Sequence, residues 1–529
     1  MSNIALTEPI RGLKMREIKL NRRDFLGGMG FGVAGTLAAG CELISAPNGN
    51  IETTPKTQLL EDENKHPLDV KLNVKQVFGA MVHSGMWEGP CRWRKPSTPA
   101  QERAQLRNQF VSVLERDKTY LSPDANLLEP LWFEYSEDLE IDQRLSKKLE
   151  PDKDHVDLYL INTNVFGQYF SALVGKMCKK PVAMRVPILG HEAAAYLRSR
   201  GIEGYVPIGY DQLNNLISIL RARKVFQQTN ILYITDRGRK LKRPVSSISD
   251  FEDLKKRFGI DTRIVTFGEL SEQINRVRQS KNIMKKAENL ADELIKNAQS
   301  CHIDRKYVIS DIEFHFAVNN LMKKYNSNAF TIECREFCAS RLPDKWKIVP
   351  CLSHVLRKDQ GHISSCEGDI NALLAMKVLT ALSKKSAYMG NLRAEGKDVI
   401  SINHCVPGMK MLGFDKPDLP YQLRNFIVSG WGTKVHIDFE KVKEKEVTIA
   451  RFNTLATKIL ATKGQVIGCR GLNEEGCSLF AVINVANAQE LANRRADYGF
   501  HFAMVYGDYT QQLDKLADLI NVEVEWNNV

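Results

Sequence analysis

The chain has 529 residues, of which 43% are hydrophobic and 26% charged, and its formal net charge is +11. This length predicts roughly three domains of about 100 to 200 residues each, and the apolar fraction is sufficient for their cores. The positive charge is spread along the sequence without zinc-finger spacing or an RNA-binding signature, so we expect no nucleic-acid partner.

The first 41 residues indicate an export signal rather than part of a fold. Residues 21–27 read NRRDFLG, and a Gly-rich apolar run follows them up to Cys41. Paired arginines, an apolar region of about 15 residues and small residues at a cleavage site are typical of a twin-arginine signal. The run is too short for a membrane-spanning helix of ~20 residues. We therefore predict a bacterial protein that the twin-arginine translocase exports in its folded state.

The residues before Cys41 resemble a lipobox, the motif at which a signal peptidase cuts so that the new N-terminal cysteine can be acylated. Ala38 stands where that motif usually has Leu. Two outcomes stay open, a lipoprotein anchored to a membrane through Cys41 or a plain cleavage site in a soluble periplasmic protein. Residues 42–69 are rich in Asn, Thr, Pro, Glu and Lys, which is the composition of a flexible linker.

A first α/β domain is predicted over residues 70–226. Within it, residues 155–161 indicate a buried strand, residues 166–177 a helix and residues 181–186 the next strand, which together make a βαβ unit. The loop of residues 162–164 follows the first of these strands, at the edge where open α/β sheets bind ligands. Its Asn and Thr side chains could equally cap a helix.

A second α/β domain is predicted over residues 227–396. Strands are expected at 230–234, 262–267 and 329–334, and helices at 251–258, from 268 onward, through much of 280–325, and from the segment 366–370 to Leu382. An apolar stripe at helical spacing, which we expect to be core, comprises Ala287, Leu290, Ala291, Leu294 and Ile295. Acidic residues at strand ends and helix starts, such as Glu333 and Asp369, stand where functional groups often lie.

The last region, residues 397–529, changes character to short β-like runs separated by Gly and charged turns. It is expected to form a β-rich domain or barrel. The fold class predicted for the whole chain is therefore α/β, with two open α/β (Rossmann-like) domains followed by a β-rich C-terminal domain. The runs lie at residues 399–402, 434–439, 446–451, 465–468 and 500–506.

The chain has eleven cysteines, and ten remain once Cys41 is set apart. An even number in an exported chain permits disulfides, but a chain with a large core does not need them. Cys334 and Cys338 have the spacing C-x3-C, yet no second pair completes a zinc site, so we expect no structural zinc.

Three segments resemble the L-fucose/L-arabinose isomerase superfamily, namely residues 366–374 (CEGDINALL), 447–451 (VTIAR) and 501–507 (HFAMVYG). The resemblance covers the architecture of residues 75–529 and is specific only toward the C-terminal end. It implies two α/β domains with a β-rich C-terminal domain, assembly as a homo-oligomer, and a divalent ion of the Mn²⁺ type held by carboxylates and a late histidine.

Carried over residue by residue, the resemblance makes Asp369 and His501 metal ligands. The family's other acidic ligand would fall near residues 350–354, which contain no Asp or Glu. Glu333 is the expected replacement, as a ligand or as the base that transfers a proton, and Glu367 is a further candidate. His404, in a Gly/Pro turn, could line the same cleft. Asp369 could instead cap a helix and His501 be an ordinary buried histidine.

The function that this resemblance implies is metal-dependent isomerisation of a small sugar between aldose and ketose through an enediol. A cation polarises neighbouring sugar oxygens while Glu333 or Asp369 moves a proton between two carbons. The alternative is a non-catalytic carbohydrate-binding lipoprotein that retains the isomerase fold, which the missing acid near Ser353 favours. A metal-dependent lyase or epimerase is a third reading, because a fold alone does not separate these reactions.

Overall fold

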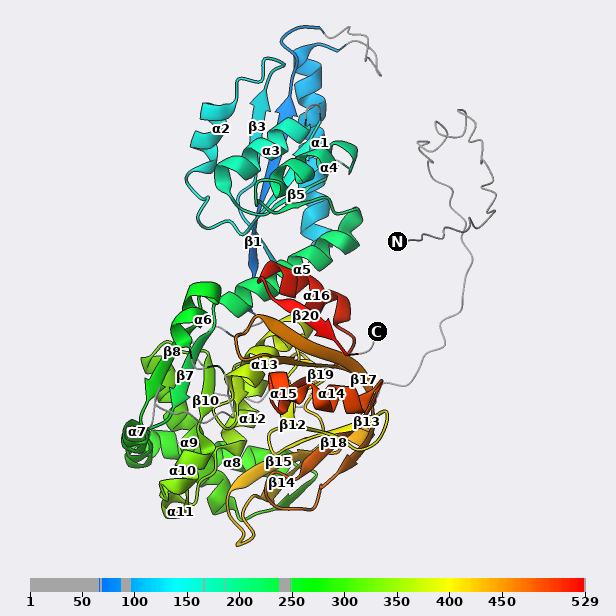
Figure 1. Ribbon diagram of the computed structural model, residues 1–529. Coiled ribbons are helices and arrows are strands. Elements are labelled where there is room, and N and C mark those ends of the chain that lie inside the picture. Colours follow the sequence, from blue (N-terminus) through cyan, green and yellow to red (C-terminus); the bar gives the residue numbers. More distant parts are fainter. Residues whose placement is uncertain are drawn as a thin grey trace, which may run out of the picture. The chain divides into compact units, whose positions relative to one another are not determined.

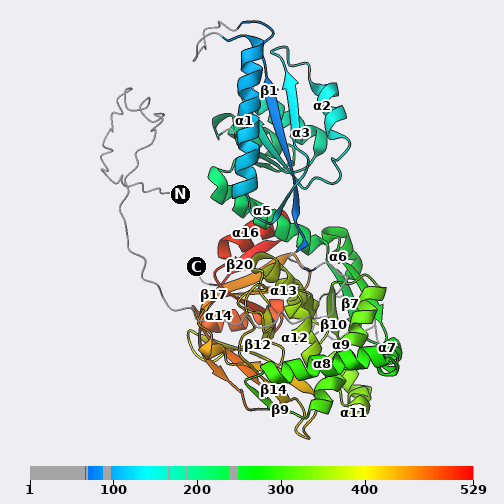
Figure 2. The same cartoon turned by 180° about the vertical axis from the view of Figure 1, so that it is seen from behind.

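The computed structural model describes residues 66, 69–86, 97–164, 167–185, 187–236, 248 and 250–527, and Figures 1 and 2 show it from opposite sides. The predicted signal peptide with Cys41 and nearly all of the predicted linker lie outside these residues, so export and lipidation stay predictions. No helix within the described ranges is both long enough and apolar enough to cross a membrane.

The first sheet is built from parallel strands in the order β2-β1-β4-β5-β6, and β3 also pairs with β1. The predicted βαβ unit is confirmed as β4-α3-β5, because β4 and β5 pair in parallel. The strands are β1 (Leu72–Met81), β2 (Ala125–Leu127), β3 (Leu131–Tyr135), β4 (Leu158–Thr163), β5 (Val182–Met184) and β6 (Gly204–Tyr205). The helices are α1 (Pro99–Tyr120), α2 (Asp142–Leu149), α3 (Gly167–Cys178), α4 (Pro187–Arg198) and α5 (Gly209–Gln227).

The loop of residues 162–164, for which the sequence left a ligand site or a helix cap open, has one side chain bonded to the backbone and two that line a pocket. The Asn164 side chain accepts from the Met81 backbone N–H at 2.9 Å and donates to the Met81 carbonyl at 2.8 Å, so it joins the ends of β4 and β1. Asn162 and Thr163 line a pocket of about 590 Å³ together with Arg116 and Arg185. A ligand at this loop stays a prediction.

The second sheet has four parallel strands in the order β11-β10-β7-β8. The predicted strand 230–234 and helix 251–258 are confirmed, and the expected stripe is core, since Ala287, Ala291 and Leu294 are buried. The strands are β7 (Asn230–Ile234), β8 (Asp261–Val265), β10 (Ala329–Ile332) and β11 (Ile363–Ser365). The helices are α6 (Phe251–Phe258), α7 (Phe267–Gln279), α8 (Lys281–Asn297), α9 (Arg305–Lys324), α10 (Cys334–Ala339), α11 (Leu342–Trp346), α12 (Cys351–Asp359) and α13 (Ile370–Ser383).

The C-terminal region forms a closed antiparallel barrel, because β17 pairs with β16 as well as with β18. The β-rich character predicted there is confirmed, and β12, which precedes residue 397, pairs with β13 and β19 in the same barrel. The barrel strands are β12 (Tyr388–Ala394), β13 (Val399–His404), β16 (Glu446–Phe452), β17 (Lys458–Arg470), β18 (Leu479–Val485) and β19 (His501–Tyr506), with β20 (Glu523–Trp526) parallel to β17. The remaining helices are α14 (Ala488–Asn493), α15 (Arg495–Tyr498) and α16 (Thr510–Leu519).

The run predicted as a strand at 434–439 belongs to a separate small sheet rather than to the barrel. This sheet has the order β15-β14-β9, and it joins β14 (Tyr421–Asn425) and β15 (Thr433–Ile437) to β9 (Ser300–His302) from the α8-α9 connection. Strand β14 pairs in parallel with β9 and antiparallel with β15. The small sheet therefore ties the helices of the second α/β region to the C-terminal region.

Helix α13 connects the second sheet to the barrel (Figure 1). Every residue from 370 to 382 is buried, and the helix packs against β11 on one side and against β16 and β19 on the other. A helix that is apolar all round is stable only when it is covered on all sides, which the run of Leu, Ala, Met and Val in this segment requires. The N-terminus of α13 thereby lies where the parallel sheet meets the barrel.

A buried carboxyl group fastens α9 to two later segments. Asp311 in α9 is fully buried and accepts hydrogen bonds from the backbone N–H groups of Val349, at 2.7 Å, and Thr433. Burial raises the pKa of Asp311 to about 8, although the two donors oppose that rise. The folded protein therefore holds a proton here that an unfolded chain would release near pH 4.

This proton makes stability depend on pH. Because the folded-state pKa of Asp311 is raised, its contribution to stability is complete below about pH 4 and is lost as the pH rises toward about 8. We expect the unfolding free energy of the wild type, minus that of Asp311→Asn, to fall over this window by up to about 1.4 kcal/mol per pH unit. Urea unfolding at several pH values measures it. A difference that rises with pH would show that the two backbone donors outweigh burial.

Candidate functional site

Two glutamates follow the ends of neighbouring parallel strands. Strands β10 and β11 pair with Thr331 opposite Ser365, and Glu333 and Glu367 come shortly after these positions. The backbone N–H of Gly368 donates to the Ile332 carbonyl at 2.9 Å, which holds the second chain segment beside the end of the first. Both carboxylates therefore belong to the C-terminal edge of the second sheet, where open α/β sheets bind ligands.

The turn that carries Glu367 has a strained backbone. Glu367 and Gly368 have φ angles of 59° and 67°, and a left-handed conformation costs a residue with a side chain of order 1 kcal/mol. A Cβ atom on Gly368 would lie 2.6 Å from Tyr233 Oη and 3.0 Å from Glu333 Oε2. Only glycine allows this close approach, so the turn brings Tyr233, Glu333 and Glu367 to one place.

Asp369 is fully buried and accepts three hydrogen bonds from protein donors. Its Oδ1 accepts from the Ala372 N–H at 2.9 Å, which caps α13. Its Oδ2 accepts from Arg451 Nη1 and from His501 Nδ1, each at 2.9 Å. Burial opposes ionisation of Asp369, but the charge of Arg451 and the hydrogen bond with His501 lower its pKa below the usual value. The alternative that Asp369 caps a helix is thus confirmed.

His404 and His501 lie at barrel strand ends and face Glu367. Both side chains are fully buried, their ring centroids are 5.2 Å apart, and His404 Nε2 lies 3.6 Å from Glu367 Oε1. One donor atom from each of Glu367, His404 and His501 lies within 4.8 Å of the other two. We call these three residues the Glu-His-His group. Two imidazoles and a carboxylate match the donor set of a transition-metal ion.

Two nitrogens of the Glu-His-His group lack a hydrogen-bond partner among the described residues, although His404 Nε2 lies 3.6 Å from Glu367 Oε1. Within the described part of the chain, Nε2 of His404 and Nε2 of His501 make no hydrogen bond. Because the Asp369 carboxylate accepts from His501 Nδ1, the lone pair of that imidazole lies on Nε2. Burial opposes ionisation of Glu367, but the nearby His404 and His501 imidazoles lower the pKa of its carboxyl group. The group therefore offers a carboxylate and a free imidazole nitrogen.

Glu333 borders this group across Gly368. Its side chain is 6% exposed, and burial, together with the charge of Glu336, raises its pKa to about 7. A carboxyl group with a pKa near neutrality can accept a proton and return it. The polar groups at this strand edge therefore include one suited to proton transfer and others suited to metal ligation.

The structure brings the three predicted site residues, Glu333, Asp369 and His501, into one region, but only two of them are in direct contact. Asp369 and His501 are in direct contact, whereas Glu333 reaches the site from the opposite side of Gly368. Both Asp369 oxygens accept hydrogen bonds from protein donors, whereas Glu367, His404 and His501 have ligand atoms within 4.8 Å of one another. The ligand roles of Glu333, Asp369 and His501 stay predictions.

Arg451 is the functional residue that the sequence did not reveal. It stands inside a continuous buried strand, β16, and it is 0% exposed. Only the pairing of distant segments shows that it neutralises Asp369. The segment 350–354, where an acidic ligand was sought, begins helix α12 and contributes the buried His354 instead.

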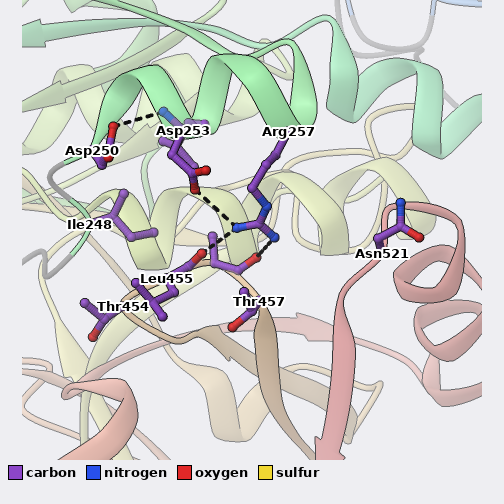
Figure 3. Close-up of a pocket in the computed structure, with 10 residues that line it drawn as sticks. Ile248, Asp250, Asp253, Arg257, Thr454, Leu455, Thr457 and Asn521 are labelled. Atoms are coloured by element: carbon purple, nitrogen blue, oxygen red, sulfur yellow. Dashed lines mark hydrogen bonds and ion pairs between the residues drawn. The ribbon is translucent and has the colours of Figure 1, made fainter.

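A separate pocket lies between α6 and the loop of residues 454–457 (Figure 3). Its volume is about 530 Å³, and the Glu-His-His group does not line it. Arg257, its central cation, bonds the carbonyl oxygens of Leu455 at 2.5 Å and Ala456 at 2.8 Å and pairs with Asp253 at 3.4 Å. Because its own neighbours occupy this cation, we do not place the chemistry there.

The fold and site thus define a mixed α/β protein with parallel sheets, a β-rich C-terminal region and residue groups able to hold a metal ion. The chain is similar to two sulfoquinovose isomerases, from Priestia aryabhattai and Priestia megaterium, each 27% identical over 184 residues. The match spans 33% of this chain and 40% of the length of each relative. No family model matches the chain. The similarity hints at a sugar isomerase, the class that the sequence resemblance implied.

The buried pair of Arg451 and Asp369 predicts a large effect on stability. Replacing Arg451 with Met leaves the Asp369 carboxylate buried without its counter-charge, which typically costs about 3–5 kcal/mol. We expect chemical denaturation of Arg451→Met to show a loss of that size. The matched control is Arg470→Met, because Arg470 pairs with Glu395 on the surface and is half exposed, so the loss should stay below about 1 kcal/mol. Equal losses in both variants would contradict this assignment.

Proposed function

We propose that this protein is a metal-dependent aldose-ketose isomerase whose reaction site is the Glu-His-His group together with Glu333. The observation that carries the proposal is a pair of buried histidines whose Nε2 atoms lack a hydrogen-bond partner among the described residues and which group with Glu367, one ligand atom from each of the three lying within 4.8 Å of the others. Burying polar atoms without partners costs free energy, and a bound cation would supply the missing partner.

The residues present fit a divalent ion, which we propose to be Mn²⁺. Imidazole nitrogen and carboxylate oxygen both suit such an ion, and a ligating histidine usually donates its other N–H to a carboxylate. Asp369 fulfils that second role toward His501 Nδ1. We therefore assign Glu367, His404 and His501 as ligands and Asp369 as the residue that positions His501. Glu333 could complete the ligand set or remain free as a base.

The reaction needs a proton to move between neighbouring carbons of an open-chain sugar. When bound, the cation would polarise the carbonyl and the adjacent hydroxyl oxygen. Glu333 accepts the proton from the carbon beside the carbonyl, which gives an enediol, and it returns the proton to the former carbonyl carbon. The hydroxyl proton passes to the former carbonyl oxygen, so the aldose and the ketose have the same composition. Tyr233 Oη, which lies against Gly368 of this turn, is the group that we propose to hold a sugar hydroxyl.

The comparisons and the donor set support the substrate class that we propose. Small aldoses and ketoses are the proposed substrates, and sulfoquinovose belongs among the first to be tested because the similar proteins are sulfoquinovose isomerases. We also propose that the protein works outside the cytoplasm as a homo-oligomer after twin-arginine export, with Cys41 as a lipid anchor. These parts rest on the sequence signals described above.

A second candidate function is carbohydrate binding without turnover. It is favoured by the absence of an acid in residues 350–354, where the resembled family carries one. The two functions differ in one property. Both allow a sugar to bind, but only an isomerase exchanges the carbon-bound proton that Glu333 would move.

The test combines metal titration with proton exchange. Mature protein is stripped of metal, titrated calorimetrically with Mn²⁺, and incubated with sulfoquinovose and other aldoses and ketoses in D₂O while NMR follows interconversion and deuterium incorporation. We expect near-stoichiometric Mn²⁺ binding and turnover in the wild type. Glu333→Gln should lower turnover by about 10²–10⁴-fold, the usual contribution of a general base.

Two further variants separate the roles of the site residues. Glu367→Gln and His404→Ala should weaken Mn²⁺ binding together with turnover, whereas the control Glu395→Gln, at a surface ion pair, should change neither. Mn²⁺ binding without exchange in any sugar would favour the binding protein. Absence of Mn²⁺ binding in the folded wild type would contradict the assigned ligands.

A further inference from the structure

A second group of potential ligands lies beside the same strand ends and consists of sulfur and imidazole. Cys334 begins α10, Cys366 follows β11, and their Sγ atoms are 3.3 Å apart. His354 of α12 completes the group, since donor atoms of all three residues lie within 4.8 Å of one another. None of these three side chains takes part in the isomerase mechanism proposed above.

His354 has a free nitrogen in this group. Its side chain is fully buried, and its Nδ1 bonds Ser364 Oγ at 2.6 Å while its ring stacks on Phe330. Among the described residues, Nε2 of His354 has no hydrogen-bond partner. A buried polar atom without a partner is costly, and here it belongs to the same cluster as two thiols. This nitrogen is the independent observation that points to a ligand for the group.

Cys334 and Cys366 are free thiols at hydrogen-bonding distance from each other, with no disulfide between them. Two thiolates on a tetrahedral Zn²⁺ ion, at about 2.3 Å each, lie about 3.8 Å apart, whereas the sulfurs of a disulfide lie about 2.05 Å apart. The two sulfurs, 3.3 Å apart as hydrogen-bonded thiols, would need to separate by only about 0.5 Å to bind one such ion. The thioether of Met389, which accepts the Cys366 backbone N–H at 3.4 Å, adds another soft atom next to the pair. Soft donors of this kind select thiophilic cations.

We propose that Cys334, His354 and Cys366 form a second metal site, for a thiophilic cation of the Zn²⁺ class, separate from the Glu-His-His group. The C-x3-C pair of Cys334 and Cys338 does not form this site, because Cys338 is exposed. Cys334 instead contacts Cys366, which follows the neighbouring strand β11. Cys334 follows Glu333 and Cys366 precedes Glu367. A cation here would clamp the ends of β10 and β11 and so fix the spacing of those two carboxylates.

Cobalt substitution tests this site directly. The full mature protein, stripped of metal and kept reduced, is titrated with Co²⁺, which gives a sulfur-to-cobalt charge-transfer band only when thiolates bind it. We expect such a band, displaced by about one equivalent of Zn²⁺ per chain, and lost in Cys334→Ser and in Cys366→Ser. Far-UV circular dichroism checks that each variant folds. His354→Gln should keep sulfur ligation but weaken binding, by at least about 10-fold.

Three controls assign the band to this site. Cys338→Ser removes an exposed thiol of the same helix, Cys477→Ser removes a thiol of the neighbouring His404, Cys405 and Cys477 cluster, and Glu367→Gln disables the Glu-His-His group. All three should retain the band. No band in the wild type, or a band that survives Cys334→Ser, overturns the proposal. A Cys334–Cys366 disulfide in protein whose thiols are blocked at cell lysis overturns it as well.

Discussion

The buried carboxylate of Asp369 is the contact on which the rest of the site depends. It caps α13, pairs with Arg451 of β16 and accepts from His501 of β19, so one side chain joins the parallel sheet region to the barrel. A buried ion pair is stable only when its geometry is good and its remaining hydrogen-bonding capacity is satisfied. The donor from the helix terminus meets that requirement. Stability of the junction and orientation of the histidine therefore have the same physical cause.

The site places polar atoms where a core would normally exclude them. Helix α13 is buried along its length, which draws its N-terminus and the preceding turn into a low-dielectric junction. The strained Glu367 lies in that turn, and His404 and His501, whose Nε2 atoms make no hydrogen bond to the described residues, approach it from barrel strand ends. Departures of this kind from a well-satisfied core cluster at functional sites, where a ligand compensates their cost. The thiols of Cys334 and Cys366 are a second set of potential metal ligands close to these strand ends, with sulfur in place of oxygen and nitrogen.

The fold was largely predictable where local signals suffice. Helix α6 is capped by Asp250 at its N-terminus and by Gly259, whose φ is 75°, at its C-terminus. Asp and Gly are the residue types that commonly mark helix ends, so the bounds of α6 could be predicted from the sequence. The site was only partly predictable, because Asp369 and Arg451 are 82 residues apart and meet only through strand pairing. Asp369 was expected to be a metal ligand. Its buried contact with Arg451 could not be predicted, because the sequence of strand β16 does not show which distant residue Arg451 meets. The contact of Cys334 with Cys366 likewise depends on β10 lying beside β11.

The most direct test of the account is the position of the ion itself. A crystal of the mature protein grown with Mn²⁺ and measured at the manganese absorption edge would locate every bound Mn²⁺ by anomalous scattering. We expect a peak coordinated by Glu367, His404 and His501, with Asp369 still bonded to Arg451 and to His501 Nδ1. A peak coordinated by Asp369 in place of Arg451, or no peak at this junction, would contradict it.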